Sequence, residues 1–228
     1  MRKNTVKVIL LAFIGMFMLV GCGSDKPELT KEESQMLAFG GILATRNEDP
    51  SLTLASNNPD SKGSLADYWE VTDAASAKET LDWLINEGHR TDGNEVLMIL
   101  KNGEESDYDL GDNVKAQFDA CNAMFKEMGI SQETVEKVKT IGAWDYDRIV
   151  NVARWSYDAE YLTEQEAWDY IKKAKELAIA DHASWEEYFV ANTYGRSIAY
   201  DGDPQELKET GLFLLNEKDS LWKANNYK

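Results

Sequence analysis

Start signals for helices constrain the fold of this chain more than any other feature. A Ser, Thr or Asp followed three residues later by Glu favours a helix start, because each side chain accepts a hydrogen bond from the other's backbone N–H. This spacing occurs at Thr30 and Glu33, and again at 163–166, 184–187 and 203–206. No alternation of period two lasts long enough to indicate a strand. The sequence therefore predicts an all-α fold, a compact multi-helix domain.

The segment 144–157 is apolar around most of its circumference, which is typical of a central, buried helix. It also carries Asp145 and Arg148 three residues apart, with Asp147 and Arg154 beside them. Charges on a buried helix are costly unless they are paired. Two interpretations follow. The favoured one is a buried Asp–Arg pair that fixes the register of the bundle, and the other is a polar site lined by Asp145 and Arg148.

The start of the chain predicts its location. Three basic residues precede an uncharged apolar run at 8–20, which is typical of a signal peptide and short for a membrane-spanning helix. Residues 19–22, Leu-Val-Gly-Cys, resemble the lipobox of bacterial lipoproteins. The resemblance implies cleavage after residue 21 and acylation of Cys22, for example with palmitate. We therefore expect a lipid-anchored protein of the bacterial cell envelope, with its domain outside the cytoplasm.

The rest of the chain divides by composition into four parts. Residues 22–29 form a short polar tether, and 30–46 are predicted to be an N-terminal helix. The segment 47–64 is rich in Asn, Ser, Asp and Pro, which indicates an exposed linker. Residues 65–228 follow as the main helical domain.

Charge limits the possible partners. The formal net charge is −17, and removing residues 1–21 would leave 21 Lys and Arg against 41 Asp and Glu. Such a surface repels phosphate backbones, so nucleic acid is not an expected partner. The membrane is expected to be reached only through the lipid at Cys22. A protein, or a small cationic or polar ligand, remains possible.

Several segments resemble a bacterial family known as domain of unknown function 1266. They are residues 142–157, 161–168, 184–188 and 195–196, with the Gly-His-Arg at 88–90 and Ser220-Leu221-Trp222 near the end. In the last motif Leu221 replaces the usual proline. The resemblance covers about residues 65–225 and implies a compact helical domain without an established activity.

No arrangement of residues amounts to a known catalytic or metal motif. His89 and His182 each lie near a predicted helix end, where a partly positive imidazole would interact favourably with the last carbonyls. Two histidines and Cys121 cannot build a common tetrahedral zinc site without carboxylates, so no metal and no cofactor are expected. Cys121, at helical spacing from two phenylalanines, is predicted to be a buried small hydrophobe.

Two functional hypotheses remain. The leading one is a non-enzymatic binding or interaction module. The alternative is a hydrolase-like enzyme with a polar cluster of His89, Asp145, Arg148 and Arg196. An aromatic pocket is a further candidate, built from Trp144, Trp155, Trp168 and Trp185 at or near helix starts, although aromatic residues at helical spacing more often form core. The two hypotheses differ in whether the polar cluster converges on an open pocket.

Overall fold

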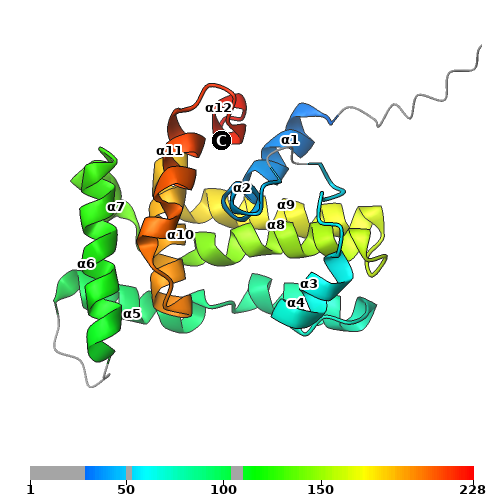
Figure 1. The fold of residues 1–228 in the computed structure, drawn as a ribbon, viewed down its shortest axis with the longest axis horizontal. Coiled ribbons are helices and arrows are strands. Elements are labelled where there is room, and N and C mark those ends of the chain that lie inside the picture. The colour runs from blue at the N-terminus through cyan, green and yellow to red at the C-terminus, as the bar shows by residue number, and fades with distance from the viewer. Residues whose placement is uncertain (1–28, 50–52, 104–109) are drawn as a thin grey trace, which may run out of the picture.

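Helix α8 (Gly142–Asp158) forms the centre of the molecule, as the sequence predicts. Nearly every residue of α8 is buried, because α4 (Ala74–Asn86), α9 (Glu164–Asp181) and α10 (Trp185–Tyr200) all pack against it. In the computed structural model, α8 and α9 lie side by side while α10 crosses one end of the pair (Figure 1). The structure describes residues 29–49, 53–103 and 110–228, and within these ranges it contains no strand. The all-α prediction is confirmed.

The other helices surround this central group. Helix α6 (Gly111–Glu127) packs against α10. Helices α2 (Gly41–Arg46) and α3 (Ser61–Trp69) both contact α8. The remaining helices are α1 (Lys31–Ala38), α5 (Arg90–Asn102), α7 (Gln132–Lys137), η1 (Pro204–Leu207), α11 (Lys208–Asn216) and α12 (Leu221–Ala224).

The helix-start signals predict the local structure unevenly. Thr30 and Thr163 form reciprocal capping boxes with Glu33 and Glu166. Ser184 caps α10, but the Glu187 side chain accepts the backbone N–H of Ala183 instead. A local signal of this kind fixes where a helix begins, whereas the partner of its glutamate depends on the surroundings.

The region before α3 differs from the expectation of one helix and an exposed linker. Residues 30–46 form two helices that meet at Gly40, and α2 packs on α8 and α11. The described residues of the segment 47–64 contact α8, where Arg154 donates to the carbonyl of Thr53 and pairs with Asp49 at 2.7 Å. A buried arginine needs such partners, and the polar composition of the segment supplies them.

The expected signal peptide and Cys22 lie outside the described residues. None of the described helices combines the length and the apolar character needed to span a bilayer.

Candidate ligand-binding pocket

A cavity of about 760 Å³ runs along one side of α8, from Trp144 to Trp155. Its other walls come from the C-terminal part of α2 and the segment after it, from α3, from the start of α5 and from the end of α10. Three residues of the predicted polar cluster, His89, Arg148 and Arg196, line this cavity. The fourth, Asp145, lies behind His89 with no exposed surface.

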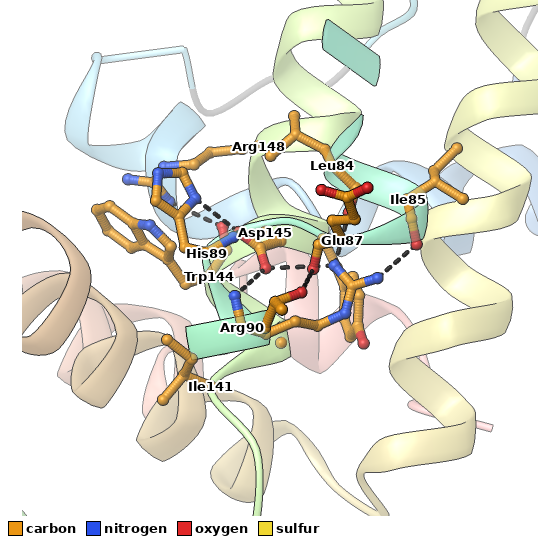
Figure 2. A network of polar contacts seen from close by, with 12 residues as sticks. Leu84, Ile85, Glu87, His89, Arg90, Ile141, Trp144, Asp145 and Arg148 are labelled. Carbon is orange, nitrogen blue, oxygen red and sulfur yellow. Dashed lines mark hydrogen bonds and ion pairs between the residues drawn. The ribbon is translucent and has the colours of Figure 1, made fainter. Parts of the chain in front are cut away.

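Asp145 holds the start of α5 through four hydrogen bonds. Its carboxylate accepts the backbone N–H groups of His89 and Arg90, both at 3.0 Å. It also contacts His89 Nδ1 at 2.8 Å and the Arg90 guanidinium at 3.3 Å (Figure 2). Gly88 precedes this turn with φ +63°, and a Cβ there would strike the carboxylate. Asp145 therefore replaces the side-chain cap that α5 lacks.

Asp147 likewise caps the start of another helix with its carboxylate. Its carboxylate accepts the backbone N–H of Ile42 at 3.1 Å and that of Leu43 at 3.2 Å, at the start of α2. The nearest cation is Arg148, 4.0 Å away. Burial raises the pKa of Asp147 to about 7, against the opposing effects of Arg148 and the two N–H groups. The expected pairing of aspartate with arginine along α8 is therefore limited to this long contact.

Three arginines from different helices converge on the cavity. Arg46 ends α2, Arg148 lies on α8 and Arg196 lies on α10. Burial lowers the pKa of Arg46 and Arg148, and repulsion from Arg196 lowers both further. Glu206, about half exposed, pairs with Arg46 at 3.1 Å and with Arg196. A strongly acidic chain thus concentrates positive charge in one place.

Several donors in this wall lack a partner. The Arg148 guanidinium stacks on the indole of Trp144 and donates once, from Nη1 to the Trp144 carbonyl at 2.9 Å. Trp144 Nε1 and Arg196 Nε are buried and make no hydrogen bond with any described residue. Buried donors are nearly always satisfied in folded proteins. These two donors are themselves buried, so the wall would have to shift slightly for them to reach an acceptor in the cavity.

Two of the four tryptophans that are predicted to form an aromatic pocket line the cavity. Trp144 and Trp155 line the cavity together with Tyr68 and Tyr200, whose exposed fractions are 81% and 68%. Exposed aromatic rings at a pocket entrance offer flat apolar surfaces to a ligand.

Trp168 and Trp185 do not line the cavity. Trp168 packs against the hydrophobic core, and Trp185 stacks on Trp222 at 4.8 Å between ring centroids.

The histidines differ from the expectation that both would interact with helix carbonyls. His89 precedes α5 and contacts Asp145. His182 does end α9, but it is buried, and neither ring nitrogen has a partner among the described residues. Burial lowers the pKa of His182 to about 4, so the ring is neutral and cannot act as a cation there. Cys121 is buried as predicted, and burial raises the pKa of its thiol to about 12.

The sequence does not predict the pocket residues Arg46, Tyr68 and Tyr200, because none of them lies in a distinguishing pattern. Glu206, which pairs with two of the pocket arginines, is predicted from its spacing to belong to a capping box. In the structure Asp203 caps η1 without Glu206, which turns to the arginines. Within the described ranges no three His, Cys, Asp or Glu residues are placed to hold a metal ion.

The comparison with protein families bears on this same region. Residues 64–227 match the family described as "Protein of unknown function (DUF1266)". The chain belongs to this family. The DUF1266 match includes His89, Arg148 and Arg196 but not Arg46, which precedes it. No curated protein and no solved structure matches the chain.

Proposed function

We propose that this DUF1266 domain binds a small organic anion in the arginine-lined pocket. The observation that carries the proposal is the convergence of Arg46, Arg148 and Arg196 on one cavity. Guanidinium groups match carboxylate and phosphate oxygens with paired N–H donors, and charge-assisted hydrogen bonds are among the strongest in proteins. A binding role also agrees with the leading hypothesis drawn from the sequence.

The charges that line the pocket, rather than the net charge of the chain, determine whether the ligand is an anion or a cation. The acidic composition of the whole chain leaves a cationic partner possible, but long-range charge is screened within about 8 Å in physiological salt. Three arginines line the pocket, and the residues that line it also carry two buried, unpartnered N–H donors, on Trp144 and Arg196. The acidic residues in the wall include Asp49, which Arg154 neutralises, and Glu48. These contacts favour an anion.

The aromatic residues of the pocket indicate that the ligand also carries an apolar or flat group. Trp144, Trp155, Tyr68 and Tyr200 would cover an apolar or flat group while the arginines hold the anionic end. Pockets that bind small molecules commonly combine apolar walls with a few polar groups that fix orientation.

Isothermal titration with phenylphosphonate tests this proposal, with choline as a cation of similar size. We expect the phosphonate to bind and choline not to bind. Arg196→Gln and Arg148→Met should each weaken binding roughly tenfold to a hundredfold, because each removes charge-assisted hydrogen bonds. Lys78→Gln is the matched control, since it removes one positive charge from an ion pair outside this pocket. Binding of choline, or no binding of the anion, would overturn the proposal.

We further propose that the domain is held at a membrane surface, outside the cytoplasm, by acyl chains on Cys22. The motif at 19–22 and the apolar run before it support this location. Metabolic labelling with palmitate tests it. Wild type should carry the label in the membrane fraction and Cys22→Ala should not, whereas an unlabelled cytosolic wild type that keeps its initiator methionine would contradict the anchor.

A further inference from the structure

Among the described residues that line the pocket, His89 has a ring that a buried carboxylate holds in place. Asp145 Oδ1 accepts the His89 backbone N–H at 3.0 Å and lies 2.8 Å from Nδ1. Asp145 Oδ2 meanwhile accepts from Arg90. A carboxylate engaged by these donors acts as an acceptor, so the proton of a neutral imidazole lies on Nδ1. Nε2 is then left with its lone pair.

The position of His89 places that lone pair at the anion pocket. About a third of its side chain is exposed, and the residue lines the same cavity as Arg148 and Arg196. The ring makes T-shaped contacts with Trp83 and Trp144, at centroid distances of 5.0 and 6.4 Å. Figure 2 shows His89, Trp144 and Arg148 together on one side of Asp145, with the Arg90 side chain on the other. Nε2 makes no hydrogen bond with a described residue.

We propose that this pocket hydrolyses a phosphoester and that His89 is the catalytic residue that transfers the proton. The inference rests on the proposed anion-binding function and adds chemistry to it. An imidazole oriented by a carboxylate is a common general base, and arginines stabilise the charge that develops on phosphoryl oxygens. A phosphoester suits three guanidinium groups better than a neutral carboxylic ester does.

The step balances with water alone. A water oxygen forms a bond to phosphorus while the ester P–O bond breaks. Nε2 accepts the proton that the water loses and returns it to the leaving oxygen, so His89 ends as it began. Arg148 and Arg196 hold the phosphoryl oxygens, and the aromatic walls hold the organic group. Asp145 is a positioning residue, because it fixes the tautomer and direction of His89 without touching the substrate.

Two substitutions separate the proton-transfer role of His89 from its structural one. His89→Asn can keep a donor toward Asp145 but lacks Nε2. His89→Phe keeps the ring contacts with Trp83 and Trp144 but has no nitrogen. Phenylphosphonate affinity and the thermal midpoint of each variant establish whether the pocket is intact, and two dissimilar variants protect the test against one of them failing to fold.

Turnover is measured with p-nitrophenyl phosphate and bis(p-nitrophenyl) phosphate, which separate monoester from diester specificity. We expect wild type and Lys78→Gln to release p-nitrophenolate from one of them. Any folded His89 variant should lose about 10²–10⁴-fold in kcat, with phenylphosphonate binding unchanged within about threefold. Asp145→Asn should lower kcat more than it changes KM.

The outcomes distinguish the two proposals. If wild type binds phenylphosphonate but cleaves neither ester, or if a folded His89 variant cleaves as fast as wild type, the catalytic inference is wrong and anion binding stands. If wild type binds no phenylphosphonate, both proposals fail.

Discussion

Asp145 and Asp147 lie two residues apart near the start of the same buried helix and perform the same structural task in different electrostatic surroundings. Each carboxylate binds the N-terminal N–H groups of another helix, α5 for Asp145 and α2 for Asp147. Asp145 has an imidazole nitrogen at 2.8 Å and a guanidinium at 3.3 Å. Asp147 has only a guanidinium at 4.0 Å, and burial raises its pKa. Similar backbone contacts thus leave one aspartate close to an imidazole and a guanidinium, and the other able to titrate near neutrality.

The largest expected effect separates the two aspartates directly. Asp145→Ala should lower the free energy of unfolding by about 3–5 kcal/mol, because it removes the carboxylate that pairs with the largely buried Arg90 and leaves two backbone N–H groups without their acceptor. Asp147→Ala should cost about 1–3 kcal/mol, since Arg148 can turn toward water in the cavity. Urea unfolding measures both. Equal losses of unfolding free energy in the two variants would show that the two aspartates do not differ in their contribution to stability.

A substitution at Gly88 tests how rigidly the Asp145 carboxylate is held. Gly88→Ala should destabilise by about 1–3 kcal/mol, because it combines a strained φ of +63° with a clash against Asp145. Gly103→Ala is the matched control, since Gly103 has φ +65° and no atom near its missing Cβ. Denaturant unfolding of both variants isolates the clash. A loss no greater at Gly88 than at Gly103 would show that the carboxylate can move.

The titration of Asp147 gives a pH test. Its folded pKa near 7 lies above the ordinary value of 3.8, so between these values the folded protein holds a proton that the unfolded chain has lost. The free energy of unfolding from this group therefore falls as pH rises from about 4 to 7, by up to about 1.4 kcal/mol per pH unit. Asp147→Asn should remove this slope.

The measured quantity in that test is the difference between wild type and Asp147→Asn across pH. His182, whose folded pKa is lowered to about 4, contributes a slope of opposite sign that cancels in the difference. A difference that does not change with pH would mean that Asp147 ionises as readily when buried as in water.

The smallest expected effect comes from Glu206, whose carboxylate is about half exposed, whereas those of Asp145 and Asp147 are buried. Glu206→Gln should tighten phenylphosphonate binding about two- to fivefold, because it frees Arg46 and Arg196 from a partly solvated ion pair. Glu209→Gln removes the same charge from the exposed surface of α11 and should leave the affinity unchanged. Titration calorimetry compares them. Equal tightening in both variants would indicate a general charge effect.

Local signals in the sequence predicted the helices well and the site only in part. The caps at Thr30 and Thr163 and the burial of α8 depend on residues within one or two turns. The partners of Asp145 and Asp147 lie 55 and about 105 residues earlier in the chain, where no periodicity could indicate them. Glu206 shows the limit most clearly, because its spacing predicts a cap and its neighbours in space are arginines.

The docking of α2 on Asp147 makes the pocket a composite of two parts of the chain. His89, Arg148 and Arg196 belong to the stretch that matches DUF1266, whereas Arg46 arrives from the helix ahead of it. A change in the residues before position 64 would therefore alter one wall of the pocket and leave the pocket residues of the matched stretch in place.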